Sequence, residues 1–200
     1  MNKSEIIGKI LEYKPNSIHE IIPSEFFTKY DSYDYVWSGN CFEWYYAISK
    51  AIQPKNFMEI GVRFGFSFLP SLIGSENLTN AIGWDLETYG NNDIAKDNLS
   101  KYYKGKAKWE ILHVDSQIEN SLPDFFDLVS IDGCHDYKCK IHDLNLAMNS
   151  SRYVILDDYD YISEVRKATD DFLIEHRDRI EWNEYIQTFR GSQLIKFKKT

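Results

Sequence analysis

Apolar residues fall into two patterns along the chain: short continuous runs of strand length, and longer stretches in which they recur at helical spacing. The short runs predict strands at residues 57–62, 80–86, 108–114, 125–131, 153–156, 180–189 and 193–197. The helical spacing predicts helices at residues 3–13, 41–52, 66–74, 93–103, 138–148 and 162–176. Strand and helix alternate about five times, which favours a mostly parallel sheet covered on both faces.

We therefore predict an α/β fold with a Rossmann-like, doubly wound sheet of seven mostly parallel strands and an antiparallel C-terminal hairpin around Gly191. The 200 residues suit a single domain with a full core. Within that domain, residues 53–200 form the predicted core and residues 1–52 an N-terminal helical and aromatic arm. Residues 16–40 of the arm are expected to form a lid or a short helical segment.

Residues 56–67 read NFMEIGVRFGFS, a strand followed by a glycine turn. Gly61 and Gly65 allow a tight turn and a close approach of the backbone to a ligand. The carboxylate of Glu59 is costly within an apolar strand unless it meets a polar ligand. A pyrophosphate would be repelled there, and the E-x-G-x-x-x-G spacing is not that of a dinucleotide or nucleoside triphosphate loop. The alternative is a turn that only connects a strand to a helix.

Carboxylates lie at or just after the ends of the predicted parallel strands. They are Glu59, Asp85, Asp115, Asp132, Asp157 and Asp158. Because the carboxyl ends of parallel strands meet at one edge of a sheet, we expect these groups to gather where such folds bind ligands. The clustered charges repel unless a cation or a hydroxyl-rich ligand neutralises them. Asp85, after the second strand, is placed to accept hydrogen bonds from ribose hydroxyls, although a helix cap or turn would also explain it.

The formal net charge of −8 and the isoelectric point near 5.1 argue against general binding to nucleic acid or to an anionic membrane. The three cysteines do not form the framework of a secreted protein, and neither a signal peptide nor an apolar run of membrane-spanning length is present in the sequence. We therefore expect a cytoplasmic protein with a small-molecule partner.

The stretches MEIGVRFGFS, IGWDL, HVDS, FFDLVSIDGCHDYKCKIHDL and YVILDDY resemble the class I S-adenosylmethionine-dependent methyltransferases. They most resemble the small-molecule O-methyltransferases that act on macrolide and aminocoumarin sugars. The matching segments extend from about residue 57 to residue 159, in the order found in the family. The IDG-x-H-x-Y stretch followed by a strand ending in DDY is more specific than the glycine turn.

The resemblance implies a role for each matching residue. Glu59, Gly61 and Gly65 would hold the methionine end of S-adenosylmethionine, Asp85 its ribose, and Asp115 and Ser116 the adenine side. The implied cofactor-binding set also includes Arg63, Ser67 and Asp132. Asp132, Asp157 and Asp158 match positions that bind a divalent cation, usually Mg²⁺, and His135 matches a residue that assists deprotonation of the acceptor. Arg63 replaces a common glycine, and Cys134 and Asp136 are also departures from the family pattern.

The residue chemistry agrees with these roles. Three carboxylates form a hard oxygen site suited to Mg²⁺, and His135 follows Asp132 closely enough to take a proton from a hydroxyl near it. The alternatives are that His135 only orients Asp132 and that Asp157 and Asp158 cap the next helix. A zinc site is a further, disfavoured interpretation; it would use Cys134, His135, Cys139 and His142.

We thus expect a metal-assisted S-adenosylmethionine-dependent O-methyltransferase whose catalytic residues are Asp132 and His135, acting on a small polyhydroxyl acceptor such as a sugar. The alternatives are methylation of nitrogen or of a catechol-like phenol, and a non-enzymatic binding or assembly protein of the same fold. The aromatic arm favours a homodimer and offers four candidates for an acceptor lid: Tyr30, Tyr33, Tyr35 and Trp37.

Overall fold

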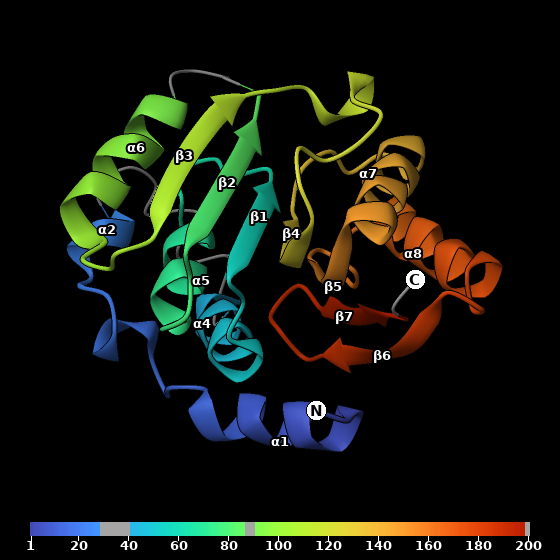
Figure 1. Cartoon of the computed structure of the whole chain (residues 1–200), viewed down its shortest axis with the longest axis horizontal. Coiled ribbons are helices and arrows are strands. Elements are labelled where there is room, and N and C mark those ends of the chain that lie inside the picture. The colour runs from blue at the N-terminus through green and yellow to red at the C-terminus, as the bar shows by residue number, and fades with distance from the viewer. Residues whose placement is uncertain (29–40, 87–90, 199–200) are drawn as a thin grey trace.

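The computed structural model describes residues 1–28, 41–86 and 91–198, which include a seven-stranded sheet with the strand order β3-β2-β1-β4-β5-β7-β6 (Figure 1). The strands are β1 (Asn56–Ile60), β2 (Asn80–Asp85), β3 (Lys108–His113), β4 (Phe126–Ile131), β5 (Ser151–Leu156), β6 (Ile180–Ile186) and β7 (Ser192–Phe197). Strands β1 to β5 pair in parallel, whereas β7 runs antiparallel to both β5 and β6. The predicted Rossmann-like sheet and its C-terminal hairpin are therefore confirmed.

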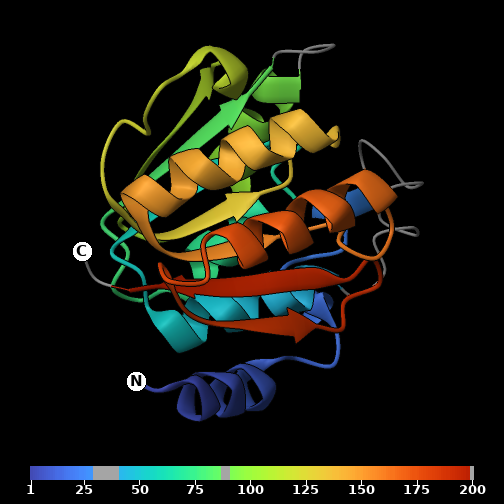
Figure 2. The ribbon, with the colours of Figure 1, turned by 90° about the vertical axis from the view of Figure 1, so that its right-hand side faces the viewer.

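Helices cover both faces of the sheet (Figure 2). The longer ones are α1 (Lys3–Tyr13), α4 (Cys41–Ile52), α5 (Phe68–Gly74), α6 (Asn91–Tyr102), α7 (Tyr137–Ser150) and α8 (Ser163–Glu175). Apolar side chains of α1, α4, α5 and α6 join one cluster with the sheet, and those of α7 and α8 join the other. Each predicted helix is present, with ends shifted by at most two residues.

Side chains alternate between the two clusters along the central strands, because successive residues of a strand point to opposite faces. In β1, Phe57 belongs to the cluster under α4 and α5, whereas Met58 and Ile60 belong to the cluster under α7 and α8. All three are buried, as the unbroken apolar runs predict for strands covered on both sides. The carboxyl ends of these strands are thereby fixed at one edge of the sheet.

The N-terminal segment packs on helix α4 through α1, and two short helical turns, η1 (Ile18–Glu20) and α2 (Glu25–Thr28), follow in the same apolar cluster. A capping box begins α1: the side chain of Asn2 accepts from the Glu5 amide, and the Glu5 side chain accepts from the Asn2 amide. Part of the predicted helical arm is thus present. The proposed lid residues Tyr30, Tyr33, Tyr35 and Trp37 lie outside the described residues.

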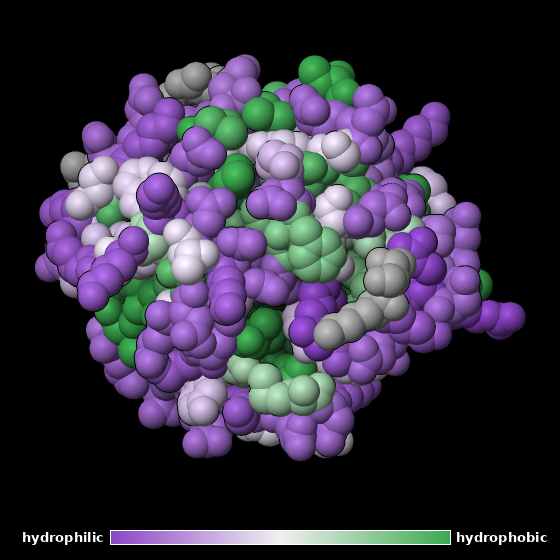
Figure 3. Space-filling view, in the orientation of Figure 1, coloured by the Kyte–Doolittle hydropathy of each residue, from purple (hydrophilic) through white to green (hydrophobic). Residues whose placement is uncertain are grey.

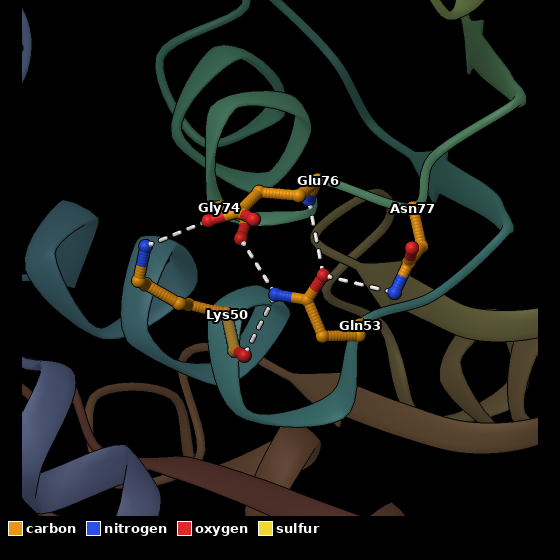
Figure 4. Close-up of polar contacts among 5 residues, drawn as sticks. All are labelled: Lys50, Gln53, Gly74, Glu76 and Asn77. Atoms are coloured by element: carbon orange, nitrogen blue, oxygen red, sulfur yellow. Dashed lines mark hydrogen bonds and ion pairs between the residues drawn. The ribbon is translucent and has the colours of Figure 1, made fainter.

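Gln53 joins the ends of α4 and α5 through its side-chain amide (Figure 4). Its Nε2 donates to the carbonyl oxygens of Lys50 and Gly74, at 2.9 and 3.2 Å. Its Oε1 accepts from the Glu76 amide and the Asn77 side chain, at 3.1 and 3.3 Å. Gln53 adopts the left-handed conformation, with φ of +54°, to reach these partners after the helix ends. Helix α5, which follows the glycine turn, is thereby tied to α4.

Hydrophilic residues dominate the face of the molecule seen in Figure 3, and its hydrophobic residues show in separate patches. Within residues 1–28, 41–86 and 91–198, no helix combines the length and the apolar character needed to cross a membrane.

Candidate functional site

The predicted acidic edge is present at the carboxyl ends of the parallel strands. Backbone hydrogen bonds continue across these ends: the Gly61 amide donates to the Trp84 carbonyl at 2.8 Å, and the Asp132 amide donates to the Ile60 carbonyl at 2.8 Å. The Asp157 amide donates in turn to the Ile131 carbonyl, at 3.2 Å. These bonds bring the loops after β1, β2, β4 and β5 together, so residues from distant parts of the sequence form one site.

The loop after β1 takes a left-handed conformation at three positions, with φ of +91° at Gly61, +48° at Arg63 and +82° at Gly65. A Cβ atom at Gly61 would lie 2.4 Å from the carbonyl oxygen of Asp132 on the adjacent loop. Position 61 therefore needs a glycine for two reasons: the backbone of the loop after β4 leaves no room for a side chain, and the backbone conformation at this position favours glycine. Arg63, which replaces a common glycine, adopts a glycine-like conformation and leaves the turn intact.

Glu59 is fully buried in β1, beneath this turn. One of its carboxylate oxygens accepts a hydrogen bond from the Ser67 hydroxyl, and the other has no hydrogen-bond partner among the described residues. Burial, together with the charges of Asp132, Asp85 and Asp157, raises the pKa of Glu59 well above its usual value, although the Ser67 bond opposes the shift. A buried, half-satisfied carboxylate is a group that a cationic ligand atom would stabilise.

Asp85 ends β2 and is tied to the glycine turn, since its Oδ2 accepts from the Arg63 amide at 2.6 Å. Partial burial raises the pKa of this carboxyl, and the backbone hydrogen bonds from Arg63 and Val62 oppose the increase. Asp85 is therefore held in one orientation beside the turn.

A groove of about 580 Å³ runs along the strand ends. It is lined by Gly61 and Arg63 of the turn, Trp84 and Asp85 after β2, Asp115 and Ser116 after β3, and Asp132 and His135 after β4, among others. This volume is within the range of small-molecule sites. The groove thus brings together most of the predicted cofactor residues, whereas Glu59, Gly65 and Ser67 are not among the residues that line it.

The segment after β3 forms the far end of the groove. Asp115 begins η2 (Ser116–Ile118), and its side chain accepts from the Gln117 amide at 3.0 Å. The Gln117 side chain donates to the Ser116 hydroxyl and to the buried carboxylate of Asp143 on α7, at 3.1 and 2.9 Å. These contacts hold Asp115 and Ser116 in place against α7.

The three predicted metal ligands lie close to two cationic groups. Asp158 is buried, has φ of +62°, and forms ion pairs with His135 and Arg190: Oδ2 lies 3.0 Å from His135 Nε2 and Oδ1 lies 3.3 Å from Arg190 Nη1. Asp157 accepts from the Ser192 hydroxyl at 2.7 Å. A left-handed conformation is uncommon for residues other than glycine, although aspartate adopts it more often than most.

The pKa values of Asp157, Asp158 and His135 shift in different directions. Burial and the charges of Asp132 and Asp158 raise the pKa of Asp157 to about 7. Burial alone would also raise the pKa of Asp158, but its hydrogen bond with His135 and the charge of Arg190 lower it overall. Asp132 and Asp158 in turn raise the pKa of His135 to about 9, so its imidazole is mainly cationic at neutral pH.

Ligand atoms of Asp132, His135 and Asp158 lie within 4.8 Å of one another, close enough to share a metal ion. Asp157, the third predicted ligand, is not in this group, and its Oδ1 accepts from Ser192 instead. Its raised pKa shows that it lies close enough to Asp132 and Asp158 to feel their charge, and the carboxylate oxygens of Asp132 and Asp158 are hard donors that fit Mg²⁺. The four residues of the zinc interpretation do not gather. Cys134 and Cys139 lie near Asp136, whereas His142 Nε2 lies 2.9 Å from the Ser116 carbonyl oxygen.

A smaller cavity of about 70 Å³ adjoins the groove and shares Gly61, Arg63, Asp132 and Arg190 with it. Several of its lining residues were not predicted as site residues, among them Arg190 and Tyr45. Arg190 lies between β6 and β7, where no sequence motif marks it, and Tyr45 on α4 has the helical spacing of a core residue. Only the packing of the C-terminal hairpin and of α4 against the strand ends places them here.

No protein-family model matches the sequence, and neither does any curated protein. Among solved structures, the S-adenosylhomocysteine-bound methyltransferase PaMTH1 of Podospora anserina matches with a TM-score of 0.64 and 15% identity, covering 100% of this chain and 98% of that chain. The O-methyltransferase TomG of Streptomyces achromogenes, involved in tomaymycin synthesis and bound to S-adenosylmethionine, matches with a TM-score of 0.65 and 12% identity, over 99% and 97% of the two chains.

The O-methyltransferase from Bacillus cereus, in complex with S-adenosylhomocysteine, matches with a TM-score of 0.59 and 18% identity, over 99% and 92% of the two chains. These likenesses show that the chain has the Rossmann-like fold of methyltransferases. At such identities they establish the fold alone, and activity has to be argued from the site.

Proposed function

We propose that this protein is an S-adenosylmethionine-dependent methyltransferase that methylates a hydroxyl of a small polyhydroxyl acceptor, such as a sugar, with the help of Mg²⁺. The observation that carries the proposal is the groove in which the glycine turn, Asp85, the Asp115–Ser116 segment and Asp132 converge. The sugar-like acceptor rests on the sequence resemblance alone.

The chain's own residues would bind the cofactor along this groove. Asp85, oriented by the Arg63 amide, would accept hydrogen bonds from the ribose hydroxyls, and Asp115 and Ser116 would contact the adenine side. Glu59 lies beneath the turn and does not line the groove, and its Oε2, which has no partner among the described residues, would accept from the ammonium group at the methionine end. Bound S-adenosylmethionine supplies an electrophilic methyl group, whose transfer depends mainly on positioning.

Asp132, Asp157 and Asp158 would hold the cation, and His135 at 3.0 Å from Asp158 would face it. A bound divalent cation lowers the pKa of a hydroxyl and orients it. As a base, His135 would have to be neutral when it accepts the acceptor's proton at Nε2. If His135 instead orients the carboxylates, its positive charge at neutral pH suffices for that role.

Isothermal titration with S-adenosylhomocysteine tests the proposal. We expect micromolar affinity, which the Asp85→Asn variant weakens by about 1–3 kcal/mol because the charged carboxylate is replaced by a neutral amide that has only one acceptor oxygen for the ribose hydroxyls. Asp97→Asn, an exposed position on α6 outside the groove, makes the same charge change and should leave the affinity unchanged. Absence of binding to the unmodified protein would overturn the proposed function.

Turnover distinguishes the remaining alternatives. A panel of sugars, catechols and amines, tested with S-adenosylmethionine present, identifies the acceptor class by which compounds are methylated. If the protein binds the cofactor but methylates none of these acceptors, it is a binding protein of this fold. We also propose a cytoplasmic homodimer, which sedimentation equilibrium and cell fractionation would test.

A further inference from the structure

Tyr45 has a buried hydroxyl for which residues 1–28, 41–86 and 91–198 supply no hydrogen-bond partner. The residue lies in the first half of α4 and is 2% exposed, and its hydroxyl oxygen has no partner among the described residues. A buried tyrosine hydroxyl normally finds a partner, and leaving one unsatisfied costs about 1–3 kcal/mol. If packing were its only purpose, a phenylalanine at this position would serve better.

The hydroxyl belongs to a cavity that continues the groove. Tyr45 and Cys41, one helical turn apart, line the cavity from α4, opposite Gly61 and Ser67 of the glycine turn. Side chains of both charges complete the lining, with Asp132 and Asp157 against Arg63 and Arg190. A cavity with both signs of charge suits a zwitterionic group rather than a simple anion or cation.

Glu59 Oε2 and the Tyr45 hydroxyl both lack a hydrogen-bond partner in the described part of the chain, and they complement each other chemically. While the Glu59 carboxyl is ionised, its Oε2 is an acceptor and cannot donate a hydrogen bond. The Tyr45 hydroxyl, by contrast, can donate one. Burial and the charges of Asp157, Asp132 and Glu59 raise the pKa of Tyr45 well above its usual value, so the phenol keeps its proton. An α-amino acid group offers a donor to the first atom and an acceptor to the second.

We propose that Tyr45 is a cofactor-binding residue whose hydroxyl donates a hydrogen bond to the carboxylate at the amino-acid end of S-adenosylmethionine. This inference rests on the proposed function, since it assumes that the groove holds this cofactor. It assigns the small cavity to the amino-acid end and leaves the larger groove to the nucleoside. Tyr45 thus selects for the complete cofactor over nucleosides that lack the amino acid.

The test compares two ligands and two matched variants by calorimetry. S-adenosylhomocysteine carries the amino-acid group, and 5′-methylthioadenosine lacks it. Tyr45→Phe removes only the proposed donor. Tyr46→Phe removes the neighbouring hydroxyl, which interacts with Lys50 and does not line the cavity. The melting temperature of each free variant is measured alongside.

We expect Tyr45→Phe to weaken S-adenosylhomocysteine about tenfold or more, since hydrogen bonds to charged groups are the stronger ones, and to leave 5′-methylthioadenosine unchanged. The free Tyr45→Phe protein should melt no lower than the parent, because the hydroxyl it lacks has no hydrogen-bond partner in the part of the chain that the structure describes. Tyr46→Phe should bind both ligands as the parent does.

Unchanged affinity of Tyr45→Phe for S-adenosylhomocysteine, or equal weakening of both ligands, would overturn the assignment of Tyr45. In either case the parent protein still binds S-adenosylhomocysteine, so the proposed function stands. Failure of the parent protein to bind either ligand would instead remove the proposed function and the inference with it.

Discussion

Replacing Glu59 with glutamine should change stability and cofactor binding in opposite directions. The carboxyl group is fully buried, and within the described ranges one of its oxygens accepts from the Ser67 hydroxyl while the other has no hydrogen-bond partner. Glutamine has nearly the same shape and retains an oxygen for that hydroxyl, but it carries no charge. The substitution therefore isolates the effect of the buried carboxylate.

The direction of the stability change follows from the pKa. Burial raises the pKa of Glu59 in the folded protein, so between the unfolded and folded values the folded chain binds more protons. The stability that Glu59 contributes is therefore fully present below its pKa in the unfolded chain. It is lost as the pH rises through its pKa in the folded protein, and the free energy of unfolding falls by up to about 1.4 kcal/mol per pH unit. Glu59→Gln removes this loss, so it should gain stability relative to the parent protein as the pH rises.

Urea unfolding at pH 5 and pH 8 measures this difference. We expect the stability of Glu59→Gln relative to the parent to increase by about 1.4 kcal/mol or more between the two pH values. Glu110→Gln, at an exposed position on β3, is the matched control and should show no such gain. At pH 8 the Glu59→Gln variant should bind S-adenosylhomocysteine about 10- to 150-fold more weakly, because the ammonium group loses a charged acceptor.

Two results would refute this reasoning. An identical pH dependence for Glu59→Gln and the parent would show that the buried carboxylate is not the source of the stability loss. Unchanged affinity for S-adenosylhomocysteine would show that Glu59 is a structural residue satisfied by Ser67.

Three further predictions follow from individual contacts. Asp157→Asn removes a buried carboxylate from the proposed cation site, so it should abolish Mn²⁺ binding measured by electron paramagnetic resonance. The affinity for S-adenosylhomocysteine should stay within about twofold of the parent value. Retained Mn²⁺ binding would contradict the proposed ligand set. Gly61→Ala should lower the free energy of unfolding by about 1–3 kcal/mol or more, since its Cβ would lie 2.4 Å from the carbonyl oxygen of Asp132. Gly8→Ala in α1 is the control: a Cβ there would meet no described atom within 4 Å outside the helix's own turn, so this variant should not be destabilised. Gln53→Ala should cost about 1–3 kcal/mol in urea unfolding, because the side chain loses its hydrogen bonds to the Gly74 carbonyl at the end of α5 and to the Glu76 amide just beyond it. An unchanged unfolding midpoint would contradict that role.

Much of the fold and of the acidic edge could be predicted from the sequence. Apolar runs identified the strands because central parallel strands are buried on both faces, and their order along the chain placed the carboxyl ends together. Asp85, Asp132, Asp157 and Asp158 were therefore expected at one edge, where the structure has them. These predictions depend only on local pattern and on the geometry of parallel sheets.

Other features depend on packing that local pattern does not determine. Arg190 reaches Asp158 because the turn between β6 and β7 lies beside the loop after β5. Tyr45 faces the cavity although its spacing on α4 is that of a core residue. Glu59 was expected at the strand edge, but the structure buries it beneath the turn, bonded to Ser67. Arg190 and Asp158 are distant in sequence and no motif links them, whereas Glu59 and Ser67 lie in one stretch whose spacing does not reveal how deeply the strand end is buried.

A crystal structure of the protein with S-adenosylhomocysteine tests the central claim most directly. The account predicts ligand density along the groove, with the ribose hydroxyls within hydrogen-bonding distance of Asp85 and the adenine beside Asp115 and Ser116. The amino-acid end should lie in the small cavity, near Glu59 and Tyr45. Density for the ligand outside this groove, or an empty groove at millimolar ligand, would contradict the claim that this fold serves as a methyltransferase.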